Sequence, residues 1–145
     1  MKILLTISFF ILNAALVSGC SSSNAPGCSE VTVQQLVKQI IDKEFRQQSF
    51  MRLLGGTMVA PPSYEVWKNN PPADHQSIQN VVMEVDEIAD NFVYELTAIR
   101  TNNINNEIMK TECASTVEFG ENTYDITYSA QYTDDNQIYV EVFGL

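Results

Sequence analysis

EIMKTECASTVEFGENTYDITYSAQY, residues 107–132, decides the fold class of this 145-residue chain. Apolar and polar side chains alternate along both halves of the stretch, which meet at the Gly-Glu-Asn sequence of residues 120–122. The apolar positions are Met109, Cys113, Val117 and Phe119 in the first half and Tyr124, Ile126, Tyr128, Ala130 and Tyr132 in the second. A period of two on both sides of a turn predicts a β-hairpin with one buried face.

Two further segments with the same period flank this hairpin. Residues 92–101 are followed by an Asn-rich turn at 102–106, and residues 138–143 follow the polar turn TDDNQ at 133–137. Their alternating apolar positions are Phe92, Tyr94, Leu96 and Ala98 in the first segment and Ile138, Val140 and Val142 in the last. We therefore expect a four-stranded antiparallel meander with one face buried and one face in water.

The last predicted strand also offers two aromatic side chains, Tyr139 and Phe143, to the wet face. If this strand lies at an edge of the sheet, its free backbone groups could accept a strand from a partner. The sequence leaves open which strand is the edge.

Two helices are expected before the sheet. After Ser29, a candidate N-cap, apolar residues recur at intervals of three and four from Val33 to Phe45, which predicts a helix over about 30–50. The same spacing from Ile78 to Ala89 predicts a second helix over 76–90. Helices that precede a meander indicate an α+β domain, with two N-terminal helices packed on one face of a four-stranded antiparallel meander sheet.

The segment between the helices, residues 55–76, is rich in glycine, proline and asparagine and is expected to be irregular. It carries Tyr64 and the only tryptophan, Trp67. Aromatic side chains on a proline-stiffened loop are candidate partner-binding residues. The alternative is that both rings fold back onto the core as a lid.

The N-terminus has the features of an export signal. Lys2 precedes an apolar run to Val17, which has the length of a secretory signal and is too short for a comfortable membrane span. The sequence Val17-Ser18-Gly19-Cys20 that follows resembles the bacterial lipobox. The resemblance implies that Cys20 receives a diacylglycerol, that cleavage precedes it, and that its new amine is acylated. The alternative is an ordinary secretory signal that happens to contain a cysteine.

A lipidated Cys20 anchors the protein to a membrane without spanning it, because two or more acyl chains give stable attachment. Ser21 follows the cysteine where an aspartate marks inner-membrane retention in the enterobacterial lipoprotein family, so the resemblance favours the outer membrane, facing the periplasm. We expect three segments: a signal peptide over 1–19, the lipidated cysteine and a flexible tether over 20–28, and a single α+β domain over 29–145.

The mature chain is strongly acidic. Lys2 is the only charged residue in the expected signal, so 7 basic and 18 acidic residues remain, for a net charge of −11. Nucleic acid is not expected as a partner, because phosphate binding needs a basic surface. An acidic surface suits solubility or docking on a basic protein partner. We expect a monomer.

Cys28 and Cys113 are the two cysteines left after lipidation of Cys20. An even pair in an oxidising compartment predicts a Cys28–Cys113 disulfide that joins the start of the first helix to the sheet. Two buried free thiols are the alternative.

No catalytic or metal-binding pattern is found, and no cofactor is expected. His75 is the only histidine, and neither a nucleophile elbow nor a set of zinc ligands is present. The acidic stretches at 86–90 and 133–137 lack the spacing of a calcium loop, so a solvated helix face and a hairpin turn explain them better.

Arg100 is a cation on a predicted strand. We expect it to pair with a nearby carboxylate, with an anchoring role toward a partner as the alternative.

The segments LTAIRTN, ECAS, DITYSAQYTDD and YVEV, within residues 92–143, resemble a C-terminal pattern of small uncharacterised bacterial lipoproteins and secreted proteins. The resemblance implies a sheet and a paired Cys113, and no activity. We therefore expect a non-catalytic protein-binding module, of which an inhibitor or immunity-type protein is one version. A structural accessory component of an envelope assembly and a small hydrolase are the alternatives.

The lipid anchor gives a direct prediction. The intact mass of the protein from a membrane fraction should equal that of residues 20–145 plus three acyl chains and a glycerol on Cys20. A mature chain without lipid mass would show that the segment is an ordinary secretory signal.

Overall fold

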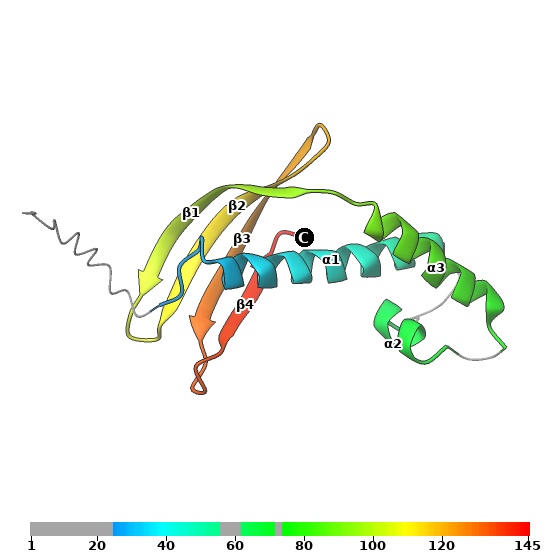
Figure 1. Cartoon of the computed structure of the whole chain (residues 1–145), viewed down its shortest axis with the longest axis horizontal. Coiled ribbons are helices and arrows are strands. Elements are labelled where there is room, and N and C mark those ends of the chain that lie inside the picture. The colour runs from blue at the N-terminus through cyan, green and yellow to red at the C-terminus, as the bar shows by residue number, and fades with distance from the viewer. Residues whose placement is uncertain (1–24, 56–61, 72–73) are drawn as a thin grey trace, which may run out of the picture.

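The protein is described from a computed structural model that covers residues 25–55, 62–71 and 74–145 (Figure 1). Three helices precede four strands, in the order α1 (Val31–Leu53), α2 (Tyr64–Asn69), α3 (Gln76–Asp90), β1 (Glu95–Asn105), β2 (Lys110–Phe119), β3 (Asn122–Tyr132) and β4 (Ile138–Phe143). The strands form one antiparallel sheet in the order β1-β2-β3-β4. The predicted α+β class and the four-stranded meander are therefore confirmed.

The predicted helices are present with small shifts at their ends. The helix expected over 76–90 is α3, and the helix expected over about 30–50 continues to Leu53 as α1. Ser29 is not the N-cap of α1: Glu30 occupies that position, and its carboxylate accepts a hydrogen bond of 2.7 Å from the backbone N–H of Gly27. The irregular segment contains a third helix, α2, which is capped by Ser63.

Strand β1 departs from the regular alternation that the sequence predicts. Its pairing with β2 shifts register between Thr97 and Arg100, and Ala98 within this bulge has a left-handed φ of 48°. The extra residue turns Ala98 to solvent, and Ile99 packs against the buried cluster in its place. The expectation that Ala98 belongs to the buried face is therefore wrong. β1 also continues to Asn105, so most of the expected turn at 102–106 is strand.

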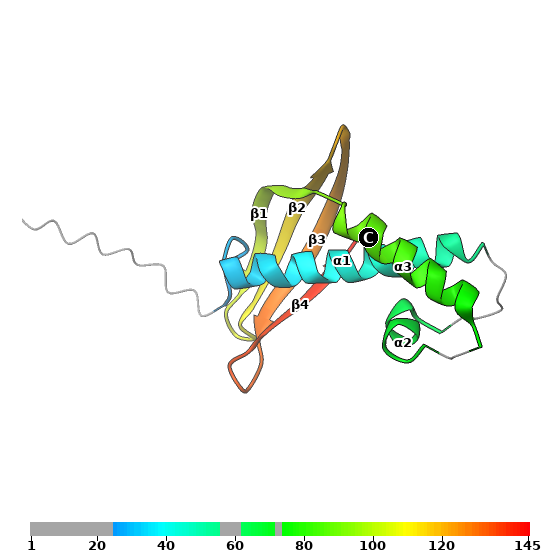
Figure 2. The ribbon, with the colours of Figure 1, turned by 45° about the vertical axis from the view of Figure 1, so that its right-hand side comes forward.

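A first buried cluster joins the first half of α1 to the sheet. It combines helix residues at intervals of four with alternating residues of β2, β3 and β4. The members are Cys28, Val33, Val37, Ile41, Cys113, Val117, Ile126, Tyr128, Ala130 and Val140. In both views of the ribbon, α1 runs across the strands and continues beyond the sheet toward α2 and α3 (Figures 1 and 2).

A second buried cluster lies where α1 extends past the sheet. Its members come from the three helices and from no strand: Phe50, Leu54, Tyr64, Trp67, Ile78 and Val85. α3 therefore buries Ile78 and Val85 against α1 and α2. The apolar stripe of α1 is long enough to serve both clusters, since Phe50 belongs to the second one.

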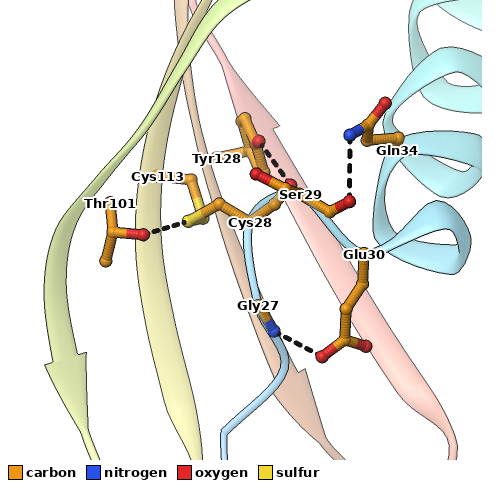
Figure 3. Close-up of a disulfide and its surroundings, with 8 residues drawn as sticks. All are labelled: Gly27, Cys28, Ser29, Glu30, Gln34, Thr101, Cys113 and Tyr128. Atoms are coloured by element: carbon orange, nitrogen blue, oxygen red, sulfur yellow. Dashed lines mark hydrogen bonds between the residues drawn. A yellow bond between two sulfur atoms is a disulfide. The ribbon is translucent and has the colours of Figure 1, made fainter. Parts of the chain in front are cut away.

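The Cys28–Cys113 disulfide is present and joins residues 85 positions apart in the sequence. Both cysteines are almost fully buried, at 3% and 1% exposure. Neighbouring side chains hold the same segment, as Figure 3 shows: Tyr128 donates a hydrogen bond of 3.1 Å to the carbonyl of Cys28, and the Thr101 hydroxyl lies 3.3 Å from its sulfur. The start of α1 is thus fastened to the strands by a covalent bond and by polar contacts.

The packed part of the chain begins before the expected boundary at residue 29. Ala25 and Pro26, placed in the expected tether, are buried. The expected signal peptide and the lipobox with Cys20 lie outside the described residues. None of the helices in the described part of the chain is long and apolar enough to cross a membrane.

Loss of the disulfide should destabilise the protein strongly. The bond joins residues 85 positions apart, and the chain-entropy model assigns a cross-link over a loop of this length about 4.5 kcal/mol of unfolding free energy. We expect the Cys28→Ser/Cys113→Ser variant to lose about this amount in urea unfolding followed by circular dichroism. The isolated Cys113→Ser variant tests for mispairing of Cys28. An unchanged unfolding midpoint in the double variant would contradict the account.

Candidate binding surface

The strand register defines a second face of the sheet, turned away from the first buried cluster. Residues paired across strands point to the same side, and successive residues alternate. Three adjacent rows of cross-strand partners therefore share the side opposite Cys113 and Tyr128, and we call them the outer face. The rows are Arg100–Ala114–Thr127–Phe143, Asn103–Glu112–Ser129–Glu141 and Asn105–Lys110–Gln131–Tyr139.

Arg100 stands at one end of the first row, on edge strand β1. Its side chain is exposed, and the guanidinium donates a hydrogen bond of 3.4 Å to the carbonyl of Ala98 within the bulge. It makes no ion pair with any residue of the described ranges, so the expected pairing with a carboxylate is not found. The row thus ends in a cation without a carboxylate partner in the described part of the protein.

The opposite end of the outer face is β4, which lies at the other edge of the sheet. Tyr139 and Phe143 are 50% and 55% exposed. The Tyr139 hydroxyl donates a hydrogen bond of 3.2 Å to Glu141, and this bond to a carboxylate raises the pKa of the tyrosine. The last strand is therefore an edge strand, which is the arrangement in which its backbone could accept a strand from a partner.

The two edge strands differ in regularity. β1 carries two register shifts, whereas every residue of β4 pairs in step with β3 from Ile138 to Phe143. Bulges discourage pairing at a sheet edge, and β4 contains no lysine, proline or bulge that would do so. β4 is therefore the edge better suited to receive another strand.

Tyr64 and Trp67, the other predicted partner-binding residues, are not on the surface. They lie on α2 in the second buried cluster and are 1% and 8% exposed. The alternative, that both rings fold back onto the core, is the one found. The Tyr64 ring packs edge-on against Phe50, with ring centroids 6.0 Å apart, and burial of these apolar rings holds the segment against α1 and α3.

A polar network surrounds the Tyr64 hydroxyl. Asp86 of α3 accepts hydrogen bonds from Tyr64, from Lys68 at 2.9 Å and from Arg46 at 2.6 Å, and Arg46 also reaches Asp90 at 2.8 Å. Partial burial alone would raise the pKa of Asp86, but the hydrogen bonds from Tyr64 and Lys68 and the nearby positive charges outweigh it and lower the pKa. This network holds α2 and α3 to α1, and it accounts for two carboxylates of the acidic stretch at 86–90.

His75 has structural contacts in this region. It stands at the start of α3, its ring lies edge-on to Trp67 with centroids 5.6 Å apart, and its Nε2 is 4.0 Å from an oxygen of Asp74. Within residues 25–55, 62–71 and 74–145, no group of three or more His, Cys, Asp or Glu side chains is placed to hold a metal ion.

A hollow of about 400 Å³ lies where the link from α3 to β1 passes α1. Its wall includes Tyr94, whose hydroxyl is 2.9 Å from a carboxylate oxygen of Asp42 and 3.1 Å from the carbonyl of Lys38. Burial, and then the hydrogen bond to Asp42, raises the pKa of Tyr94. The sequence alone does not predict this cluster. Tyr94 is 52 positions from Asp42 and 56 from Lys38, so only the folded chain brings them together.

Comparison with known proteins gives no relative. The chain matches no protein-family model, no curated protein and no solved structure.

The charge of Asp86 should contribute to stability in a pH-dependent way. Because its pKa in the folded protein lies below its ordinary value of 3.8, its contribution is complete above that value and is lost as the pH falls through the lowered pKa. We expect Asp86→Asn to reduce the unfolding free energy by about 1–3 kcal/mol at pH 7, since hydrogen bonds to a charged group are lost. Urea unfolding between pH 7 and pH 3 measures this.

The matched control is Glu87→Gln, an exposed neighbour on the same helix. It should be near neutral at every pH. The deficit of Asp86→Asn should shrink below pH 4, and a deficit that is independent of pH would show that the charge of Asp86 is not responsible.

Proposed function

We propose that this protein is a membrane-anchored envelope lipoprotein that acts as a non-catalytic protein-binding module through the outer face of its sheet. The observation that carries the proposal is the row that runs from the exposed Arg100, which forms no ion pair within the described residues, to the exposed Phe143 on the regular edge strand β4. We infer further that α1 and α3 both lie on the side of the first buried cluster. In that arrangement no helix covers the outer face.

The arrangement of side chains on the outer face suits contact with a protein. Between Arg100 and Phe143, the central strands contribute Ala114, which is 1% exposed, and the exposed Thr127, so Thr127 is the residue that a partner can touch in the middle of the row. Arginine and large aromatic residues are the types that most often dominate binding energy at protein interfaces. A partner segment seated on the row would thus meet one cation and one apolar anchor, with Thr127 between them.

The edge of β4 adds a second mode of contact to the same surface. An extended segment of the partner could pair with the backbone of β4 and place alternate side chains beside Tyr139 and Phe143. Backbone pairing would supply affinity, and the adjacent aromatic side chains would supply selectivity.

Charge favours a basic partner. The whole chain has a net charge of −10, although the outer face itself carries two acidic residues, Glu112 and Glu141, and two basic residues, Arg100 and Lys110. Complementary charge speeds encounter and disfavours wrong partners. Arg100, at the β1 end of the first row, would then fix orientation by binding a carboxylate or carbonyl of the partner.

The proposed location at the membrane depends on lipidation of Cys20. A lipid anchor would hold the domain near a bilayer, where it meets envelope proteins at high local concentration. An inhibitor or immunity-type protein would bind one toxin or hydrolase in isolation. A structural accessory component would be found within a larger assembly, and a small hydrolase would show turnover.

The proposal is tested by site-specific capture in the native envelope. A photoreactive amino acid at Thr127, exposed in the centre of the outer face, should cross-link one abundant protein, which mass spectrometry identifies. The same amino acid at Glu87 on α3 is the position control. Arg100→Ala/Phe143→Ala should reduce the capture at Thr127 by tenfold or more, since loss of two anchors costs about 2 kcal/mol or more.

Met83→Gln is the matched control for loss of an exposed apolar side chain, because Met83 is 60% exposed on α3. It should leave the capture unchanged. Equal capture from positions 127 and 87, or capture that the double variant does not alter, would show that the outer face is not the binding surface.

A further inference from the structure

A second concave site lies on the opposite side of the sheet from the outer face. It is an open cleft of about 410 Å³ between the second half of α1, the link from α3 to β1, the ends of β2 and β3, and the two residues after β4, Gly144 and Leu145. We call it the aromatic cleft. The residues that carry the argument are Phe45, Phe92, Phe119, Tyr124, Ile126 and Arg52.

Four aromatic rings form a continuous row along this cleft. Phe45 of α1 stacks on Phe92 with centroids 4.1 Å apart, Phe92 meets Phe119 edge-on at 5.3 Å, and Phe119 stacks on Tyr124 at 5.4 Å. Helix α1, the link from α3 to β1, and the β2–β3 hairpin thus contribute to one apolar wall. Mutual contact holds the rings in place before any ligand arrives.

These rings remain accessible although they are packed together. Tyr124 is 57% exposed, and Phe45, Phe92 and Phe119 are each partly exposed. A contiguous apolar surface in water is costly, and such surfaces commonly mark binding sites. The volume falls within the range of about 300–1,000 Å³ that is typical of small-molecule sites.

One rim of the cleft is polar and is formed by successive turns of α1. Glu44, Gln48 and Arg52 are spaced by four and all line the cleft. Glu44 already accepts a hydrogen bond of 3.0 Å from the amide of Gln48. Arg52 makes no ion pair with the described residues, so its charge is free to meet an anion at the mouth.

We propose that the aromatic cleft binds an anionic amphiphile, with an apolar tail against the rings and a carboxylate head at Arg52. The tail would displace water from the exposed parts of Phe119 and Tyr124. The head would replace water at a guanidinium whose charge has no partner among the described residues. The inference is independent of the outer face and of any protein partner.

Charge and polarity disfavour the other occupants. A second copy of the chain would bring another net charge of −10 against the first, whereas a carboxylate head brings a single negative charge, which Arg52 can meet. An extended peptide would place its backbone N–H and C=O groups on an apolar floor, where unpaired polar groups cost free energy. A single tail with one anionic head avoids both penalties.

The test uses the full chain in its native membrane vesicles and a photoactivatable dodecanoate that carries a diazirine near the end of its tail. After irradiation, mass spectrometry should locate label in residues 111–145 and in the second half of α1. Labelling should be saturable and should be displaced by unlabelled dodecanoate. A dodecyl ammonium of equal tail length should compete poorly, because its head is repelled by Arg52.

Two variants leave the core untouched. Gln48→Trp fills the cleft from an exposed helix position and should abolish saturable labelling. Arg52→Glu should weaken binding about tenfold, the loss expected for a charge-assisted contact. Lys43→Glu, an equal change of charge at an exposed position of α1 that does not line the cleft, should leave binding unchanged.

Non-saturable labelling, labelling that Gln48→Trp does not reduce, or equal effects of Arg52→Glu and Lys43→Glu would each overturn the proposal. A photoreactive amino acid at position 119 tests whether a second copy of the chain or another protein occupies the cleft. If it captures a second copy or another protein, and the fatty-acid probe is not retained, the cleft is a polypeptide site.

Discussion

One helix supports the whole molecule, because α1 belongs to both buried clusters. Its 23 residues extend about 35 Å at 1.5 Å per residue, which is more than contact with the sheet requires. Val33, Val37 and Ile41 contribute to the cluster shared with the strands, and Phe50 contributes to the cluster shared with α2 and α3. A rigid rod common to both clusters fixes the helical half relative to the sheet. The stacked rings of Phe45 and Phe92 add a contact between α1 and the link from α3 to β1, where the helices meet the sheet.

This constraint divides the surface into three regions. The first cluster joins residues of α1 to residues of the strands and is fastened by the Cys28–Cys113 bond. The aromatic cleft lies between the second half of α1 and the ends of β2 and β3. On the opposite side, the rows from β1 to β4 contain polar, small and edge aromatic side chains. Of the two surfaces proposed for binding, the aromatic cleft has α1 as one wall, and the outer face lies on the other side of the sheet from the first cluster.

Local pattern in the sequence was enough to predict most of the fold. The period of two in residues 107–132 identified the central hairpin, and spacing by three and four identified α1 and α3, because burial of one face imposes these periods. The pairing of Cys28 with Cys113 followed from the number of cysteines and the expected compartment. The bulge at Ala98 was not predicted, since an extra residue in a strand leaves no local signal in a stretch such as LTAIRT.

The candidate site was harder to predict than the fold. Tyr64 and Trp67 were selected because they stand among prolines, yet their large apolar surfaces are buried against α1 and α3. Tertiary contact decided between the two alternatives, and local composition could not. Arg100 was recognised as unusual, but its lack of a carboxylate partner depends on the strand register. The cleft rings are separated by as many as 79 positions, from Phe45 to Tyr124, so only the folded chain brings them together.

The central claim, that the outer face binds a protein in the envelope, is tested most directly by hydroxyl-radical footprinting. Oxidation of Tyr139 and Phe143 would be compared in native membranes and in protein purified away from them, with exposed Met83 on α3 as the internal reference. The account predicts that both aromatic side chains are protected in the membranes while oxidation of Met83 is unchanged. Equal oxidation of Tyr139 and Phe143 in both preparations would contradict it.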